Sequence, residues 1–224
     1  MVRRLRSFRS DCARWGLARS LFMRFMASQS SWLNVSYAVQ RDLRRPLPNL
    51  TFPSDVSFRL VEHRELLLFL EDPEIPLSRT FVDDAVSRGD ICVGAFVGDR
   101  LVAFTWRAFR STPHAHGLMF SFAKPYRYGY HAFTLPAYRG MHLQEALSKI
   151  TDALCIERGH THGMGFIEIC NYPSLTMAAR TGSERVGIVG YIRLLGGVFP
   201  FRSAGARRKG VGFVSKSQTS GSVP

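Results

Sequence analysis

Long apolar runs are missing from this sequence. No hydrophobic stretch approaches the roughly 18–20 residues that cross a bilayer as a helix, which argues against an integral membrane protein. Cysteine is also scarce. The four cysteines, Cys12, Cys92, Cys155 and Cys170, are scattered and form no C-x-x-C pair. This spacing argues against common zinc-binding and disulfide-rich frameworks and favours reduced, mostly buried thiols in a cytoplasmic protein.

Acidic residues are rare at both ends of the chain. Residues 1–50 hold ten arginines against two aspartates, and residues 201–224 hold five basic residues and no acid. Residues 51–200 carry fifteen basic and fifteen acidic residues, so the net charge of +13 comes entirely from the ends. A neutral body with basic ends favours an anionic surface as partner, membrane or nucleic acid, over a basic active site.

The N-terminal segment has a helical apolar pattern. Its apolar residues recur at three- and four-residue steps, with arginines largely between them: Leu5, Phe8, Cys12, Trp15, Phe22 and Phe25. This predicts an amphipathic helix with a basic polar side. Three interpretations stay open: residues 1–30 bind an anionic membrane surface, pack their apolar stripe on the domain, or form a mitochondrial-type transit peptide. Nothing resembles a nucleic-acid recognition module, so nucleic acid is the least favoured partner.

The remaining composition is that of one globular domain. With 224 residues, 46% hydrophobic and 21% charged, the chain is long enough for a single core. We divide it into a basic amphipathic segment with an early strand (1–50), a central domain (51–200) and a Gly/Ser/basic tail (201–224) that we expect to be disordered.

Periodicity and turn signals predict a mixture of strands and helices. Strands are expected at 34–42, 56–61, 91–97, 101–109, 118–122, 128–135, 165–170 and 186–195, and helices at 66–70, 78–87, 143–154 and 174–180. Gly98-Asp99-Arg100 is a strong hairpin signal between two of the strands. This order is consistent with one α/β domain.

One stretch predicts a site for phosphate. The strand that ends near Leu135 breaks at Pro136, and a helix restarts just past Gly140. Unpaired backbone N–H groups at the start of that helix converge on one point, and the helix dipole adds partial positive charge there. Arg139 adds a guanidinium, which binds phosphate well.

The same stretch, Pro136-x-x-Arg139-Gly140, resembles the acyl-CoA pyrophosphate loop of the GNAT N-acyltransferase superfamily. Two further places share the resemblance: the hairpin around Gly98, and Asn171 to Ser174 running on to Gly182, which is similar to the family's Asn-x-x-Ser segment. The resemblance covers roughly residues 55–195. It implies a mixed, mostly antiparallel central sheet flanked by helices.

The resemblance also implies a reaction and a cofactor. An acyl group, most often acetyl, would move from coenzyme A to the primary amine of a small acceptor by direct attack, without a metal. The strand ending at Leu135 would splay from the 165–170 strand and expose backbone groups to the pantetheine arm, and a backbone N–H there would polarise the thioester carbonyl. The residues that would hold the cofactor are Phe133, Thr134, Leu135, Arg139, Gly140, Met141, His142, Leu143, Gln144, Asn171 and Ser174.

Two departures from the family pattern weaken this assignment. His142 and Gln144 stand where the family favours glycine, because backbone must approach phosphate closely. We expect weaker binding or a different acyl carrier. Ala178 stands where many members place a tyrosine that protonates the leaving thiolate, so that proton would come from water or from Tyr172.

The general base is open between three residues. Tyr130 and His131 lie on the strand where some members keep a glutamate base, and Glu168 lies on the neighbouring strand. Strand alternation points only one of the first two into the cleft, and imidazole suits proton transfer near neutral pH. The pairs His114/His116 and His160/His162 have no further ligand nearby, so we expect solvated loop histidines and no metal.

Other functions also remain open. The altered loop and a surplus of aromatic residues in the central strands fit transfer of a long acyl chain from coenzyme A or a carrier protein. The loss of the family's tyrosine fits an inactive GNAT-fold module for binding or membrane docking. The acceptor and the oligomeric state, including a homodimer, are not determined by the sequence.

Overall fold

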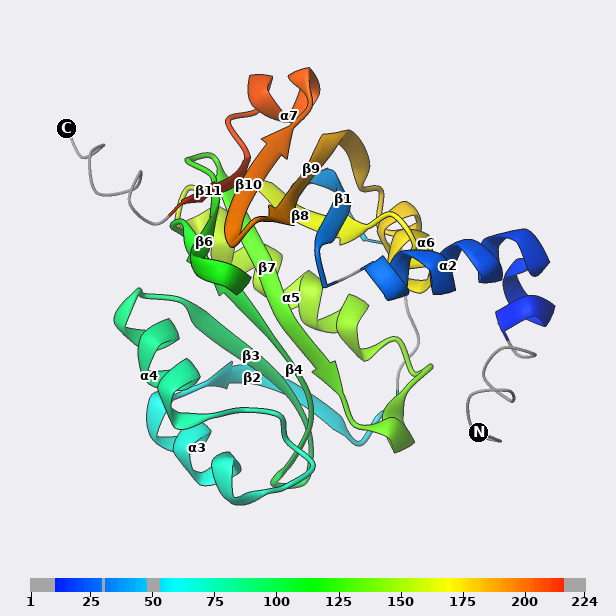
Figure 1. Ribbon diagram of the computed structural model, residues 1–224. Helices are drawn as coiled ribbons and strands as arrows, with labels where there is room; N and C mark the ends of the chain where they lie inside the picture. Colours follow the sequence, from blue (N-terminus) through cyan, green and yellow to red (C-terminus); the bar gives the residue numbers. More distant parts are fainter. Residues whose placement is uncertain (1–10, 30, 48–52, 216–224) are drawn as a thin grey trace.

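The computed structural model describes residues 11–29, 31–47 and 53–215. Its main element is an eight-stranded sheet in the order β10-β9-β1-β8-β7-β4-β3-β2 (Figure 1). The strands are β1 (Leu33–Asp42), β2 (Val56–Val61), β3 (Ile91–Val97), β4 (Arg100–Ala108), β7 (Tyr126–Thr134), β8 (His162–Glu168), β9 (Glu184–Leu194) and β10 (Gly197–Arg202). A smaller sheet contains β11 (Gly212–Ser215), β6 (Leu118–Ser121) and β5 (Thr112–Pro113).

The helices connect these strands. They are α2 (Leu17–Gln29), α3 (His63–Leu68), α4 (Arg79–Ser87), α5 (Leu143–Glu157), α6 (Tyr172–Arg180) and α7 (Ala204–Arg208), with short 3-10 turns η1 (Phe69–Glu71), η2 (Ala115–Gly117) and η3 (Pro136–Tyr138). The predicted strands and helices of residues 34–195 are all present, with bounds within three residues of those expected. No helix in the described part of the chain is both long and apolar enough to cross a bilayer.

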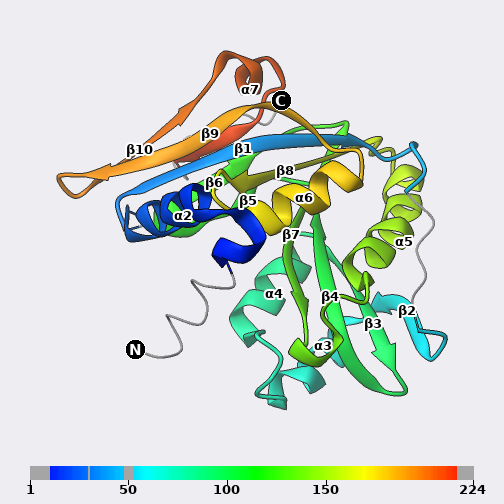
Figure 2. The same ribbon diagram turned by 90° about the vertical axis from the view of Figure 1, so that its right-hand side faces the viewer.

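All neighbouring strands of the large sheet are antiparallel except β7 and β8, which are parallel. The sheet is strongly twisted. Figure 2 shows β10, β9 and β1 running across the picture while β7, β4 and β3 run down it. The predicted mixed, mostly antiparallel sheet flanked by helices is therefore confirmed.

Strand alternation places different residues on the two faces of β4. Trp106 faces α4, where its ring lies edge-on to Phe81 with centroids 5.3 Å apart. The next residue, Arg107, faces α5 and donates to Ser148 Oγ at 3.3 Å. α3 and α4 thus cover one face of this half of the sheet and α5 covers the other (Figure 1).

The small sheet covers the other half. Phe120 of β6 packs on Tyr128 of β7, with ring centroids 4.7 Å apart, and Phe213 of β11 packs on Phe166 of β8 at 4.9 Å. These rings belong to a second apolar cluster that also contains Met164. The strands around the β7–β8 junction are therefore held firmly on this face.

The tail was expected to be disordered, and for residues 201–215 this is wrong. These residues finish β10 and form α7 and β11, and Ala206, Val211 and Phe213 are all buried. Gly187 of β9 permits the close approach of α7, because a Cβ there would lie 2.5 Å from the backbone nitrogen of Ala206. The few apolar residues of this segment hold it against the domain, because Ala206, Val211 and Phe213 occupy core positions. Residues 216–224 lie outside the described part.

The N-terminal helix is interrupted rather than continuous. Residues 11–15 are helical, Gly16 adopts a left-handed conformation (φ +83°), and α2 begins at Leu17. Trp15 packs on Tyr172 of α6 with ring centroids 5.7 Å apart. In α2, however, Leu21 and Phe25 are 52% and 60% exposed. The segment contacts the domain through Trp15 and leaves apolar residues of α2 in solvent. The predicted Leu5 and Phe8 lie outside the described residues.

Candidate active site

A cavity opens where β7 and β8 separate. The two strands pair only over three residues each, 126–128 and 162–164. Beyond these, β7 continues to Thr134 beside β4, and β8 continues to Glu168 beside β1. The splay expected from the sequence is therefore present. It leaves a cavity of about 540 Å³ lined by β1, β4, β7, β8, α5 and α6, a size typical of small-molecule sites.

A β-bulge in β7 borders this cavity. Trp106 pairs with Tyr130 and Phe104 pairs with Phe133, so that His131 and Ala132 both lie opposite the single residue between them on β4. His131 has a positive φ of 46°. A bulge adds twist and disrupts the hydrogen-bond ladder locally, which turns the backbone of β7 beside the cavity.

The start of α5 has the geometry of an anion site. Gly140 (φ +86°) and His142 (φ +57°) are left-handed, and His142 makes no side-chain cap. Within the described part of the chain, none of the backbone N–H groups of residues 140–145 donates a hydrogen bond. Arg139 is exposed, with Nε 3.3 Å from the Thr134 carbonyl oxygen. Free N–H groups and the dipole of a 15-residue helix thus lie next in the chain to one exposed guanidinium.

Gln144 narrows the cavity just behind this point. Its Nε2 donates to the carbonyl oxygens of Phe133 at 2.7 Å and Phe104 at 3.1 Å, and lies 3.1 Å from Thr134 Oγ1. The N–H of Leu135 donates to the Val102 carbonyl oxygen at 2.9 Å. Two of the backbone groups that were expected to meet a pantetheine arm therefore already have partners within the chain.

An ion pair links the two helices beside the cavity. Glu145 in the first turn of α5 lies 3.1 Å from Nη2 of Arg180 in the last turn of α6, and its other contact is His142 Nδ1 at 3.3 Å. Glu145 is buried and lines the cavity. The pair fixes the distance between α5 and α6.

Tyr130 lines the cavity in a protonated state. Its hydroxyl donates to Asp90 Oδ2 at 2.7 Å and accepts from Arg88 Nη2 at 3.3 Å. Burial, followed by the charge of Asp90, raises the pKa of Tyr130 well above its ordinary value, so the phenol does not act as a base. Burial also raises the pKa of Asp90. Sequence analysis missed Asp90, whose only signal was a carboxylate at the start of an apolar strand.

His131 is the candidate base whose position fits best. It lines the cavity, its ring stacks on Phe81 with centroids 4.4 Å apart, and its Nε2 lies 3.0 Å from the Pro76 carbonyl oxygen. A carbonyl only accepts, so Nε2 carries the hydrogen and Nδ1 of the neutral ring keeps its lone pair. The strained bulge conformation and the stacked ring hold this lone pair in place.

The structure does not bring Glu168 and Tyr172 to the cavity lining. Glu168 is exposed and accepts from Asn34 Nδ2 at 3.3 Å, and the Tyr172 ring lies between Trp15 and the Arg19 guanidinium.

The far side of the cavity is formed by α6. Asn171 caps this helix by accepting from the Ser174 N–H at 3.2 Å, while Ser174 and Ala178 line the cavity. The inner end of the cavity is lined by Arg41, Arg107 and Arg127, none of which sequence analysis singled out.

One histidine of each pair, His114 and His160, makes packing or hydrogen-bond contacts inside the fold. His114 stacks on Phe213 with centroids 4.7 Å apart, and His160 Nδ1 lies 2.9 Å from the Tyr126 carbonyl oxygen. In the described ranges no group of three or more His, Cys, Asp or Glu side chains could hold a metal ion.

Comparison with known proteins finds distant structural neighbours. No family model matches the sequence, and no curated protein matches it either. A Drosophila protein of solved structure superposes with a TM-score of 0.50 and 14% identity, covering 80% of this chain and 58% of its own. A tandem GNAT protein from the clavulanic acid biosynthesis pathway gives a TM-score of 0.48 at 17% identity, covering 68% of this chain and 50% of its own.

A GCN5-related N-acetyltransferase from Sphaerobacter thermophilus gives a TM-score of 0.49 at 10% identity, covering 80% of this chain and 55% of its own. This chain thus spans about half to three fifths of the length of these three proteins. At 10–17% identity the likeness to these structures concerns the fold alone.

Proposed function

We propose that this chain, with its GNAT fold, is an N-acyltransferase that moves an acyl group, most simply acetyl, from coenzyme A to the primary amine of a small acceptor. One observation carries the proposal. The cavity between the splayed strands β7 and β8 is lined by Tyr130 and His131 and reaches the first turn of α5 at Gln144 and Glu145, whose N–H groups are free. Such a cavity can hold two reactants in line.

The residues present fit coenzyme A in part. The pyrophosphate would be held by residues 139–144, whose N–H groups are free. The pantetheine arm would lie along Phe133 and Thr134 of β7, and for this Gln144 must turn away from the Phe133 carbonyl oxygen. Asn171 and Ser174 would flank the arm from α6, where the Asn171 side chain already serves as a helix cap.

The chain's own groups then have simple roles. Bound acyl-CoA would supply an activated thioester. His131 would accept the ammonium proton of the acceptor through Nδ1, leaving a neutral amine that can attack. A backbone N–H of the bulge near Phe133 would donate to the developing oxyanion. With Tyr172 packed against Trp15, water would relay the proton that the attacking nitrogen loses to the leaving thiolate, which gives the amide and the thiol.

The test is a titration of the purified chain with coenzyme A, acetyl-CoA and a long-chain acyl-CoA by calorimetry, followed by turnover with a panel of amines. Binding of a thioester and acyl transfer to an amine would support the proposal. If no thioester binds even when Gln144 is replaced, coenzyme A is excluded as the acyl carrier and this proposal fails. Binding of a thioester without acyl transfer to any amine would favour an inactive binding module.

A long-chain donor is the second candidate. The observation that favours it is the aromatic wall of the cavity, which includes Tyr128, Tyr130 and Phe166. These rings suit an acyl chain better than a methyl group. Tighter binding of the long-chain thioester than of acetyl-CoA would favour this donor, and the reverse order would favour acetyl.

We also propose that the N-terminal region docks on an anionic membrane. Exposed apolar side chains lie on α2, in the turn that follows it and on the β9–β10 hairpin: Leu17, Leu21, Phe22, Phe25, Trp32, Leu194, Leu195 and Phe199. The Arg193 N–H donates to the Trp32 carbonyl oxygen at 2.7 Å, so the hairpin tip lies beside the chain that leaves α2. Figure 2 shows both at the same end of the molecule.

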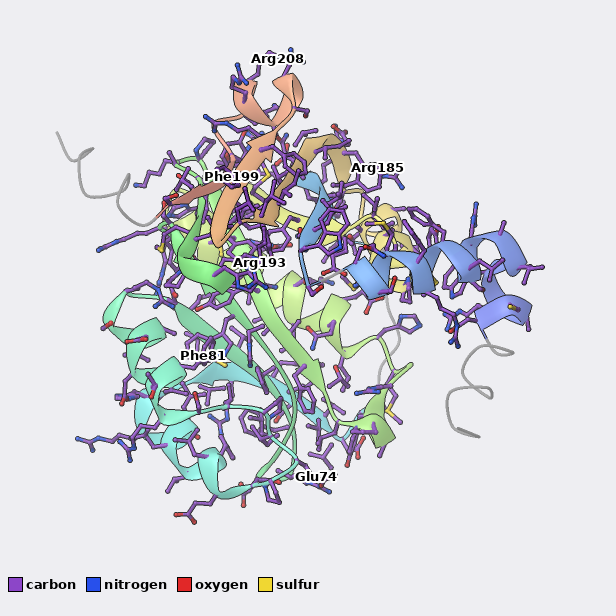
Figure 3. All side chains as sticks on the ribbon, in the orientation of Figure 1. Glu74, Phe81, Arg185, Arg193, Phe199 and Arg208 are labelled. Carbon is purple, nitrogen blue, oxygen red and sulfur yellow. The ribbon has the colours of Figure 1, made fainter. Side chains whose placement is uncertain are left out.

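Charge supports an anionic lipid surface as the partner of this face. Arg14, Arg19 and Arg24 flank the apolar residues, and Arg193 lies on the hairpin with Phe199 (Figure 3). Exposed apolar side chains with basic neighbours are the pattern of interfacial helices.

A further inference from the structure

Arginine and glycine alternate on one face of four neighbouring strands. Arg41 of β1 and Arg127 of β7 both pair with Gly163 of β8, and Gly129 of β7 pairs with Arg107 of β4. All these residues are on the face covered by α5, because side chains in register across a sheet share a face. The sequence shows none of this, since the three arginines are far apart in the chain.

The two glycines make room for the guanidinium groups. A Cβ at Gly163 would lie 3.1 Å from Cζ of Arg127. A Cβ at Gly129 would lie 3.1 Å from Nη1 of Arg127 and 3.2 Å from Nη1 of Arg107. The guanidinium groups therefore fold over glycine positions and form one layer between the sheet and α5. We call Arg41, Arg107 and Arg127 the arginine layer.

The arginine layer is buried and holds more positive than negative charge. Arg41, Arg107 and Arg127 are 7%, 4% and 7% exposed. Arg41 and Arg127 share one carboxylate, Asp152 of α5, which accepts from Arg127 Nη2 at 2.9 Å and from Arg41 Nη2. The three cations thus face a single anion of the same layer.

Among the described residues, Arg107 has no carboxylate partner. It donates to Thr105 Oγ1 at 2.6 Å, to the Trp106 carbonyl oxygen at 2.9 Å and to Ser148 Oγ at 3.3 Å, all of them neutral. Glu145 also lines the cavity, but it pairs with Arg180. Burial, and then the charge of Arg127, lower the pKa of Arg107 to about 9. A buried cation without a counter-charge is costly.

The pairs with Asp152 explain why Arg41 and Arg127 help to hold α5 on the sheet, but they leave Arg107 unexplained. All three arginines line the cavity. In the described part of the chain, Nε of Arg107, Nε of Arg127 and Nη1 of Arg41 are buried without a partner. The arginine layer therefore keeps positive charge that no carboxylate of the layer balances, and N–H donors that have no acceptor.

We propose that the arginine layer is a binding site for an acidic group of a substrate, a carboxylate or a phosphate. Guanidinium groups match the oxygen geometry of both. The layer lies at the closed end of the cavity, where β7 and β8 still pair, and His131 lies four residues further along β7. The assignment of this acidic group to a substrate rests on the proposed function. Under that function, the acidic group belongs either to the far end of the acyl group or to the amine acceptor.

Anion binding can be tested without coenzyme A. Succinate, glutarate and inorganic phosphate are titrated into the full chain by calorimetry, and its thermal unfolding is followed in the same anions and in chloride at matched ionic strength. We expect at least one of the three anions to bind and to stabilise the chain beyond chloride. Failure of all three to bind would overturn the proposal.

Variants locate the bound anion. Arg107→Met should weaken anion binding about tenfold or more, since a charge-assisted hydrogen bond is lost. The matched control Arg110→Met, at an exposed arginine just past β4, should bind the anion as the natural chain does. Unchanged anion affinity in Arg107→Met would refute the site. If Arg107→Met does not fold, Gly129→Ala, which keeps every charge and displaces the guanidinium groups, should weaken binding in its place.

Asp152→Asn separates a binding role from a structural one. It removes the carboxylate that competes for Arg41 and Arg127, so anions should bind more tightly to this variant and restore part of its stability. A merely structural layer would give a less stable chain whose response to anions is unchanged, and that result would overturn the proposal.

Thioesters then identify the source of the acidic group. If the donor carries it, succinyl-CoA should bind more tightly than acetyl-CoA, and Arg107→Met should abolish the difference. If the acceptor carries it, the two thioesters should bind equally, and turnover should require an amine with a carboxylate or phosphate. Anion binding without any thioester binding would retain the site and refute the acyltransferase.

Discussion

Gln144 Nε2 lies 2.7 Å from the Phe133 carbonyl oxygen, so a side chain in the first turn of α5 that lines the cavity is hydrogen-bonded to the backbone of β7. A backbone carbonyl that would otherwise point into an open cleft is already hydrogen-bonded by a side chain of the same protein. If coenzyme A binds as proposed, its pantetheine arm would use the same carbonyl, and Gln144 would act as a gate that opens on binding.

Replacing Gln144 should therefore strengthen the binding of coenzyme A. In Gln144→Gly the Phe133 carbonyl is free. Because the Gln144 side chain no longer competes with coenzyme A for this carbonyl, the affinity for coenzyme A should rise about tenfold. Glycine in a helix costs about 1 kcal/mol of stability, so Gln144→Ala serves as the matched variant without that cost. Calorimetry measures the affinity, and values equal to that of the natural chain in both variants would contradict the gate.

Arg139→Ala should weaken coenzyme A binding about tenfold or more, because a charge-assisted contact to phosphate is lost. Its free energy of unfolding should change little, since the side chain is exposed. Arg208→Ala is the matched control, because Arg208 is an exposed arginine of α7, at the top of the molecule in Figure 3. Equal affinities in the two variants would remove Arg139 from the phosphate site.

Tyr130→Phe should lower the free energy of unfolding by about 1–3 kcal/mol at neutral pH, because buried Asp90 loses a donor. The variant should also change the alkaline response. The folded pKa of Tyr130 is raised, so its contribution is complete below the unfolded pKa near 10 and is lost as the pH rises towards the folded pKa. Stability should thus fall less steeply above about pH 10 in Tyr130→Phe than in the natural chain. Denaturant titrations at several pH values measure the free energy of unfolding of both chains. If it falls with pH equally steeply in the variant and in the natural chain, Tyr130 ionises normally.

Anion binding at the arginine layer should weaken as the pH rises through about 9, where Arg107 loses its proton. The groups that face Arg107 include Arg127 of β7, Arg41 of β1, and Asp152 and Cys155 of α5. The pKa of Arg107 is lower in the folded chain than in the unfolded chain, so above pH 9 the unfolded chain binds more protons than the folded chain. The contribution of Arg107 to the free energy of unfolding therefore rises with pH in this range. The anion-dependent part of the stability should fall over the same range. Calorimetry at pH 7 and pH 10 measures it, and an affinity independent of pH would contradict the prediction.

Membrane docking should depend on the apolar face of α2. The double variant Leu21→Glu, Phe25→Glu should bind phosphatidylserine vesicles about tenfold more weakly or worse in a sedimentation assay. Two side chains then no longer enter the hydrocarbon layer of the membrane. Its folding should be unaffected, since both residues are exposed. Leu68→Glu on α3, at another exposed leucine, should sediment as the natural chain does. Full sedimentation of the double variant would exclude this face.

Several elements were predictable because their signals are local. Ser78 caps α4 by accepting from the Phe81 N–H at 3.3 Å, and Gly98 turns the β3–β4 hairpin with a positive φ of 56°. Such signals depend on a few neighbouring residues, and neighbours in sequence stay neighbours in the fold. The splay of β7 and β8 followed from the resemblance and is present in the structure.

The candidate site was less predictable, because its members meet only through the register of strands. Glu168 and Tyr172 were reasonable candidates by position along the chain, yet Glu168 is exposed beside Asn34 and Tyr172 packs on Trp15. The contact of Gln144 with Phe133 was equally invisible, since it depends on how far α5 lies from β7.

The sequence by itself determined the order of elements, the turn chemistry and the place where α5 starts with free N–H groups. The tertiary structure decided where charge is placed. Residues 51–200 balance fifteen bases with fifteen acids, which argued against a basic site. Folding nevertheless places Arg107 and Arg127 of this segment, together with Arg41 from the N-terminal 50 residues, in one buried layer with a single carboxylate. A count of charges sums over the whole segment, whereas the field at a site depends on burial and distance, and both are set by contacts between strands far apart in the chain.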